Sequence, residues 1–290
     1  MARALRGALA ALCLLCGLSA RAQSPVWAIR GAHNTVFIAE SVHLLKPGDS
    51  ALPRPFERAY AAAQIIVMEV DLTRIDAGEM QSFLAAHGML HGATLEHAVG
   101  ERLYRRVASE AERLGLPLAS VESLEPWTVA LMFDDLEYLR LGYDAESGVE
   151  RQIERRAERD GKPIRGLETL DQELGELAHL PPAEQNRFLD LTVDDMHDAE
   201  RDTDELLAAW RAGDTRKLAS LLSSAYLRFP ELYRVLITER NSRWFPQIER
   251  ELADSRDYLV IVGALHVVGP GGLLERARSA GFTPRPVRAH

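Results

Sequence analysis

Two stretches near opposite ends of the chain follow one pattern: an apolar run, a few small or polar residues, and then a histidine. The first is FIAESVHLL at residues 37–45, and the second is VIVGALHVVG at residues 260–269. Short apolar runs rich in β-branched residues are typical of strands whose two faces are both buried. The pattern therefore predicts a strand near each end of the chain, with a histidine just beyond it.

Each predicted strand belongs to a unit in which strands and helices alternate. Residues 26–30 and 35–39 indicate a hairpin around a Gly-Ala-His-Asn turn, and PFERAYAAAQ indicates a helix before the buried strand IIVMEV at residues 65–70. Near the other end, DYLVIVGAL predicts a strand, HVVGPGG a loop, LLERARSAG a helix and PRPV an edge strand. Strand, helix and strand in succession favour a βαβ arrangement.

The middle of the chain is predicted to be mainly helical, because apolar residues recur there at helical spacing. The helical regions are 95–115, 127–142, 149–161, 182–225 with two or three helices, and 238–255, kinked or started at Pro246. Short strands are predicted at 116–122 and 163–167. The expected fold class is α/β (or α+β). A mixed central sheet comes from N- and C-terminal βα units of one domain, residues 23–290, with a helical insertion at about residues 90–250.

The first 22 residues have the composition of a signal peptide. Arg3 and Arg6 precede an apolar stretch at residues 8–18, and Ala20-Arg21-Ala22 has the form of a cleavage site. The apolar stretch is too short to span a bilayer, so we expect cleavage and no integral membrane segment afterwards. The mature chain is expected to be secreted or periplasmic.

Removing that segment changes what chemistry the chain can support. Both cysteines, Cys13 and Cys16, lie within it, so the mature chain is expected to have no disulfide, cysteine nucleophile or thiolate metal site. Loss of three arginines moves the formal charge from −9 to −12. An acidic chain is unfavourable for binding nucleic acid or an anionic membrane, so neither is expected as a partner.

Polar residues at the predicted strand ends are the main candidates for a site. Residues just beyond the carboxyl ends of parallel strands gather in one crevice, which places His43 and His266 together if the first and last units are neighbours. Glu69 and Asp71 alternate along MEVD and thus face the same side of another strand end. The alternative is structural: hydrogen-bonded histidines, and a salt bridge for Glu69.

Other motifs fit structural roles better. His87, His91 and His97 include a pair spaced like helical metal ligands, but Gly88 and Gly92 favour an exposed loop. GPGG at residues 269–272 lacks the Lys and Ser/Thr of a phosphate-binding loop, and no G-x-S-x-G is present.

The order of short motifs along the chain resembles the TraB/GumN family, which is related to the Tiki metalloproteases and more distantly to ChaN-like and erythromycin-esterase-like proteins. The matching stretches are VWAIRGAHNTVFIAESVHLL, LPRPFERAYAAAQIIVMEVDL, EPW, LGYD, GKPIRGLET followed by Gln172, ERN, and VIVGALHVVGPGGLLERARSAGFTPRPV. The resemblance implies two GxxH motifs, at residues 40–43 and 263–266. Glu40 stands where the family usually has Gly, and it either crowds the site, supplies a further carboxylate or marks a loss of activity.

The resemblance also implies a metal site and a set of roles. His43, Glu69 and His266 would bind a divalent transition metal, Zn, Mn or Co, since imidazole and carboxylate suit these ions. A further carboxylate would take a proton from the attacking water, with Glu168 the first choice and Glu40 the second.

Three more residues enter the implied site in supporting roles. Asp71 would orient a ligand without touching the ion. Arg240 and Asn241 of ERN would stabilise an oxyanion or pair with the acids, and we favour the pairing.

Three functions follow from these patterns. The first is a metal-dependent hydrolase, peptidase-like, acting on a peptide or other small substrate. The second is a non-catalytic binding or regulatory protein of the cell envelope that captures a peptide, a polysaccharide or haem. The third is a subunit of an envelope assembly that uses the acidic helical insertion as its contact surface.

Overall fold

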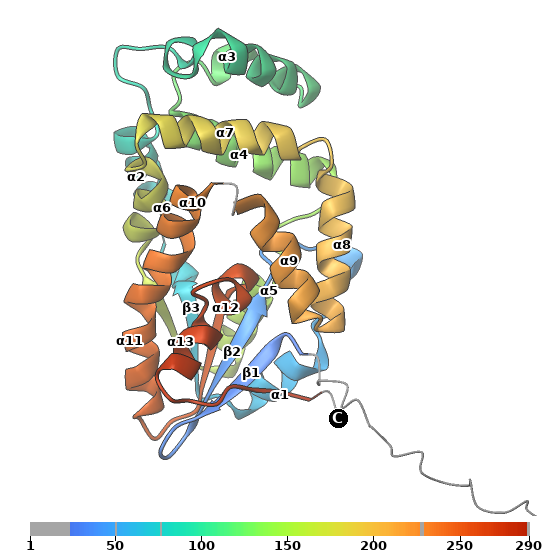
Figure 1. Cartoon of the computed structure of the whole chain (residues 1–290), viewed down its shortest axis with the longest axis vertical. Helices are drawn as coiled ribbons and strands as arrows, with labels where there is room; N and C mark the ends of the chain where they lie inside the picture. The colour runs from blue at the N-terminus through green and yellow to red at the C-terminus, as the bar shows by residue number, and fades with distance from the viewer. Residues whose placement is uncertain (1–23, 50, 76, 227–228, 289–290) are drawn as a thin grey trace, which may run out of the picture.

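The computed structural model describes residues 24–49, 51–75, 77–226 and 229–288 and contains a six-stranded mixed sheet, which lies in the lower half of the view in Figure 1, below a helical part. The strands are β1 (Val26–Arg30), β2 (Thr35–Ser41), β3 (Ile65–Val70), β4 (Ile164–Glu168), β5 (Tyr258–Gly263) and β6 (Arg285–Pro286). Their spatial order is β4-β3-β5-β2-β1-β6. The expected signal peptide, with both cysteines, lies outside the described residues.

The four strands from β4 to β2 run parallel, and β1 is antiparallel to both of its neighbours. β5 therefore lies between β2 and β3, which brings the two ends of the chain into one sheet. This confirms the predicted α/β fold with a mixed sheet built from N- and C-terminal units. β4 comes from within the predicted insertion and returns the chain to the edge of the sheet.

Helices cover both faces of the sheet, which is why the strands are apolar on both sides. One face packs against α1 (Arg54–Ala62), α5 (Val149–Asp160), α8 (Ala199–Ala212) and α9 (Thr215–Tyr226), and its core includes Phe56, Ile66 and Trp210. The other packs against α11 (Arg240–Leu252) and α13 (Leu273–Ser279), around Val67 and Trp244. Consecutive residues of β3 thus enter different cores, as strand geometry requires.

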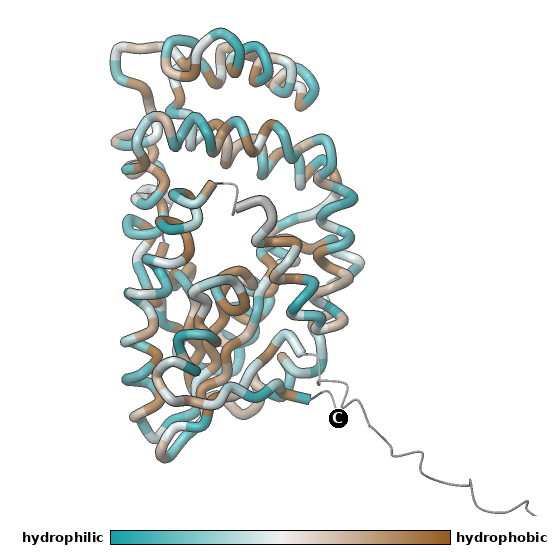
Figure 2. Tube along the Cα trace, viewed as in Figure 1, coloured by the Kyte–Doolittle hydropathy of each residue, from teal (hydrophilic) through white to brown (hydrophobic). Residues whose placement is uncertain are grey.

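A third core holds the rest of the insertion together. Its helices are α2 (Ala77–His87), α3 (Leu95–Arg113), α4 (Pro126–Arg140), α6 (Leu170–Ala178), α7 (Pro182–Asp195) and α10 (Pro230–Tyr233). Trp127 and Phe133 of α4 are fully buried in this core. Figure 2 shows apolar residues concentrated on the strands and alternating with polar ones along the helices. None of the described helices is long and apolar enough to cross a membrane.

Some local predictions were wrong. The strand predicted at 116–122 is replaced by a 3-10 turn, Leu118–Ser120, because Pro117 fixes the backbone and cannot donate to a ladder. The predicted loop after β5 contains the short helix α12 (Ala264–Val268), and Pro246 lies inside α11, which continues through it. A π-helical segment, Arg234–Glu239, directly precedes α11, and further 3-10 turns span Pro47–Asp49 and Leu72–Arg74.

Candidate active site at the strand ends

The carboxyl ends of the four parallel strands carry most of the predicted site residues. His43 lies two residues beyond β2, and His266 lies three residues beyond β5. Glu69 is the last residue but one of β3, and Glu168 is the last residue of β4. A β-carbon added to Gly263 would lie 3.4 Å from Glu69 Oε1 and 3.6 Å from His43 Nε2, and 3.7 Å from the ring of His266. The structure therefore brings both histidines and Glu69 around one point, as the strand-end argument predicts.

His266 is buried and held in one orientation. Its Nδ1 lies 2.9 Å from Oδ1 of Asn241, whose Nδ2 donates to the backbone oxygens of His266 and Gly271. Because Asn241 Nδ2 is the donor there, Oδ1 must accept, so the proton of His266 is on Nδ1 and Nε2 keeps its lone pair. Burial lowers the pKa of His266 to about 3, which leaves the ring neutral, stacked against Trp244 with 4.5 Å between ring centres.

His43 has the opposite electrostatic environment. Its side chain is 65% exposed, and its Nδ1 lies 2.9 Å from Oε1 of Glu150 in the first turn of α5. The Glu150 carboxylate raises the pKa of His43 to about 10, so the ring is charged at neutral pH. Gly148 allows this approach, because a β-carbon there would lie 2.0 Å from the backbone oxygen of His43.

Arg240 lies at the centre of the buried charges. It donates from Nη2 to Glu69 Oε2 at 2.6 Å and from Nε to Glu168 Oε1 at 2.9 Å, and its Nη1 lies 3.3 Å from His266 Nε2. Glu69 Oε1 accepts from the Gly263 N–H at 2.6 Å. Burial opposes ionisation of Glu69, but the positive charges of Arg240 and His43 hold its pKa low. Arg240 thus neutralises carboxylates that burial would otherwise make costly.

Glu168 has both carboxyl oxygens engaged. Oε1 accepts from Arg240, and Oε2 accepts from Trp244 Nε1 at 3.0 Å. The side chain is only 2% exposed, and burial raises its pKa.

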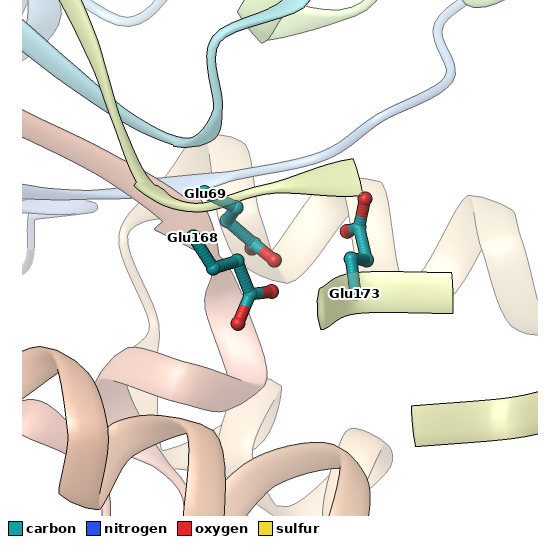
Figure 3. Close-up of side chains that lie close together, drawn as sticks. All are labelled: Glu69, Glu168 and Glu173. Atoms are coloured by element: carbon teal, nitrogen blue, oxygen red, sulfur yellow. The ribbon is translucent and has the colours of Figure 1, made fainter. Parts of the chain in front are cut away.

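Sequence reasoning missed Glu173 and Glu150. Glu173 lies in the first turn of α6, the helix that directly follows GLET, and its side chain is 33% exposed. Burial and the Glu69 charge raise its pKa to about 7. Figure 3 shows it close to Glu69 and Glu168. The capping box of Thr169 and Gln172 fixes the start of α6 and can be read in the sequence. No motif singles out Glu150 within the helix predicted at residues 149–161.

Glu40 and Asp71 lie in surroundings of their own. Glu40 is fully buried, its Oε1 accepts from Trp27 Nε1 at 3.3 Å, and burial raises its pKa to about 8. It pairs with Val262 across the sheet, one position before Gly263. Asp71 accepts from the Thr73 N–H and hydroxyl and so begins a 3-10 turn. Neither carboxylate has a described hydrogen bond or ion pair to His43, Glu69 or His266.

His87, His91 and His97 are all exposed, His87 at the end of α2 and His97 within α3. Within the described part of the chain, the one group of acids or histidines whose ligand atoms all lie within 4.8 Å is Glu69, Glu168 and Glu173. The ligand atoms of the predicted set, His43, Glu69 and His266, do not all lie within that distance of one another, although His266 Nε2 is 4.0 Å from Glu69 Oε2.

The residues fit a transition metal in their chemistry. Both imidazoles have Nδ1 engaged by a polar partner, which is how ligating histidines are usually oriented, and Glu69 is ionised nearby. Two features oppose binding: His43 is charged and must lose the proton on Nε2 before it can coordinate an ion, and Arg240 Nη1 must release its 3.3 Å contact with Nε2 of His266.

Comparison with known proteins points to one family. The model of the TraB/PrgY/gumN family matches residues 25–286. The chain is 24% identical over 238 residues to a protein described as uncharacterized protein YbaP from Escherichia coli (strain K12), a match that covers 82% of this chain and 86% of the relative. The protein of the same description from Shigella flexneri matches equally. No solved structure matches.

Proposed function

Since this chain belongs to the TraB/PrgY/gumN family, we propose that it is a secreted or periplasmic metal-dependent hydrolase that acts on peptide bonds. The observation that carries the proposal is the convergence of His43, Glu69 and His266 around Gly263. One residue comes from the N-terminal motif, one from the C-terminal motif and one from the strand that adjoins β5. Packing of the sheet alone does not require these three side chains to meet at one edge.

His43, Glu69 and His266 would hold a Zn, Mn or Co ion. Such an ion would supply Lewis acidity, which would make the attacking water more acidic and polarise the substrate carbonyl. Glu150 and Asn241 fix the two rings through Nδ1, so Nε2 of each is the atom that would coordinate, in His43 after loss of the proton that this nitrogen carries in the metal-free protein.

The neighbouring groups have distinct tasks in this proposal. Glu168 takes the proton from the attacking water, because burial raises its pKa and Oε2 keeps one lone pair beside the Trp244 contact. Arg240 stabilises the negative charge that develops on the substrate oxygen, because its Nη1 makes only long contacts, 3.3 Å to His266 and 3.4 Å to Leu236 O. The remaining contacts hold the guanidinium in place.

The test is hydrolysis of a peptide library by the purified mature chain, with and without chelator. The proposal expects chelator-sensitive cleavage that Zn, Mn or Co restores. Glu168→Gln should lose at least about 100-fold in kcat while keeping bound metal, since general-base catalysis contributes roughly that much. Cleavage that is indifferent to chelator, or no cleavage by metal-loaded protein, would remove the hydrolase proposal.

A second candidate is a non-catalytic binding protein of the cell envelope. The observation in its favour is that Arg240 already bonds Glu69 and lies against Nε2 of His266, so a cation already occupies the position beside both groups. A ligand that raises the melting temperature and is recovered intact would support this candidate. Stoichiometric metal with turnover would exclude it.

A further inference from the structure

Trp244 contacts three groups of the candidate site with one fully buried side chain. Its Nε1 donates to Glu168 Oε2 at 3.0 Å, and its ring stacks on His266 with 4.5 Å between ring centres. The guanidinium carbon of Arg240 lies 4.7 Å from the centre of the indole. Arg240 and Trp244 are four positions apart on α11, so they share one face of the helix. One side chain therefore connects the proposed proton acceptor, a proposed metal ligand and the buried cation.

The acceptor of the Trp244 indole differs from that of the other fully buried tryptophans. A buried indole N–H needs a hydrogen-bond partner, and a backbone carbonyl satisfies it. Trp127 donates to the carbonyl oxygen of His87 at 3.2 Å, and Trp210 donates to that of Glu40 at 2.7 Å. Trp244 donates instead to a carboxylate at the end of β4. Packing of a buried indole does not by itself require that choice.

The indole controls how the Glu168 carboxylate is turned. Nε and Nη2 of Arg240 both contact Oε1, and among the described residues Trp244 is the one hydrogen-bond donor to Oε2. The last torsion of a glutamate side chain has broad minima, so a carboxylate anchored at one oxygen can rotate. The Trp244 N–H fixes the second oxygen and thus the plane of the group. It occupies one lone pair of Oε2 and leaves the other available.

Trp244 is itself held by packing. It belongs to the core between the sheet and α11, where it is surrounded by apolar residues that include Val67, Ile248 and Val260. A reacting group has to be held within a fraction of an ångström of its productive position, and a side chain locked by its neighbours can provide that support.

We propose, on the basis of the proposed function, that Trp244 is a positioning residue that directs the available lone pair of Glu168 Oε2 toward the attacking water. Its N–H sets the orientation of the carboxylate, and its ring, stacked on His266, sets where that carboxylate lies relative to the metal-binding side chains. Trp244 acts through Glu168 and takes no proton itself, because an indole N–H is a donor without an acceptor.

Trp244→Phe removes the N–H and keeps an aromatic ring against His266. We expect kcat for peptide hydrolysis to fall about tenfold, because a hydrogen bond to a charged group is lost, while KM and the retained metal stay at their wild-type values. The matched control is Trp127→Phe, which removes the N–H of another fully buried indole, in α4, and should keep the wild-type kcat. An unchanged kcat in Trp244→Phe, or loss of metal in that variant, would overturn the inference.

A double-mutant cycle with Glu168→Gln separates positioning from a general structural role. If Trp244 acts through Glu168, adding Trp244→Phe to Glu168→Gln should cost no further kcat. A further tenfold loss in that background would show that Trp244 acts on another group. If Trp244→Phe does not fold, replacement of Trp244 by benzothienylalanine, which keeps the fused rings and has sulfur in place of N–H, allows the same comparison. A loss of kcat in Glu168→Gln without one on removal of the Trp244 N–H would reject this inference and leave the hydrolase proposal intact.

NMR of labelled tryptophan tests the underlying contact without turnover. The chain has four tryptophans and thus four indole N–H signals, and the one absent from Trp244→Phe belongs to Trp244. That signal should move upfield in Glu168→Gln, because a neutral amide is a weaker acceptor than a carboxylate, while the Trp127 signal stays in place. Movement of the Trp244 signal supports the contact even if no peptide is cleaved. No movement would contradict the inference whatever the fate of the hydrolase proposal.

Discussion

The two histidine-bearing strand ends have the same position in the sheet and opposite electrostatics. His43 is exposed, lies beside the Glu150 carboxylate and has a pKa raised to about 10. His266 is buried, lies beside the Asn241 amide and has a pKa lowered to about 3. The charge of each ring therefore depends on the partner at Nδ1 and on the access of solvent. The GxxH spacing encodes neither of these.

The residue three positions before the histidine also differs between the two strand ends. A β-carbon at Gly263 would be in van der Waals contact with Glu69 and His43 and would occupy the position between them. Glu40 lies inside its strand, opposite Val262, with its carboxyl against Trp27. The two motifs are offset by one residue across the sheet, so Glu40 and Gly263 face different surroundings.

Gly263→Ala is expected to have the largest effect on this pair of strand ends. The backbone of Gly263 suits any residue, with φ −50° and ψ 140°, so folding should be preserved. The new methyl would lie 3.4 Å from Glu69 Oε1 and 3.6 Å from His43 Nε2, and the ligands could not close around an ion. Metal affinity, measured by calorimetry, should fall at least about 100-fold. Gly48→Ala, where the methyl meets open space, is the control; equal affinity in both variants would contradict the site.

Exchanging the partners of the two rings should move their pKa values toward each other. Glu150→Gln removes a carboxylate and should lower the pKa of His43 from about 10 by roughly 1–3 pH units. Asn241→Asp adds a carboxylate and should raise the pKa of His266 from about 3 by a similar amount. The measurement is NMR titration of the imidazole protons in metal-free protein. If neither value moves, the Nδ1 partners do not set the ring charges.

Glu40→Gln should change the pH dependence of stability. The folded-state pKa of Glu40 is about 8, above its ordinary value of 4.5, so its contribution is fully present below pH 4.5 and is lost as the pH rises through 8. The wild type should lose up to about 1.4 kcal/mol per pH unit in this window relative to Glu40→Gln. Urea unfolding of both chains between pH 4.5 and 9 measures the difference. Parallel curves would show that Glu40 is ionised in the folded state.

Substitution of the exposed histidines should have the smallest effect. His87 and His91 lie outside the described site, so His87→Ala with His91→Ala should change metal affinity less than about twofold, within the range of surface substitutions. Loss of binding in this double variant would move the metal site to the helical insertion.

The sequence predicted the sheet well because its strands carry their own signal. The run at 65–70 was predicted with its observed bounds, and the strand predicted at 163–167 is β4, Ile164–Glu168. α12 was missed because five residues rich in valine between glycines do not show a helical period. The strand wrongly predicted at 116–122 shows that an alternating pattern does not outweigh Pro117.

The site was predictable where it depends on strand ends. His43, Glu69 and His266 follow from the rule that the ends of parallel strands meet, whereas Glu168 followed only from the family resemblance. Glu150 and Glu173 come from helices, and the docking of a helix onto a strand end leaves no pattern in a single sequence. Their contacts with His43 and Arg240 required the structure.

Metal content is the most direct test of the claim that both ends of the chain build one site. The purified mature protein, loaded separately with Zn, Mn and Co and then dialysed, should retain one equivalent of at least one of these ions. His43→Ala and His266→Ala should each lose it, because each removes a ligand. No retained ion in the wild type, or full retention in either variant, would contradict the account.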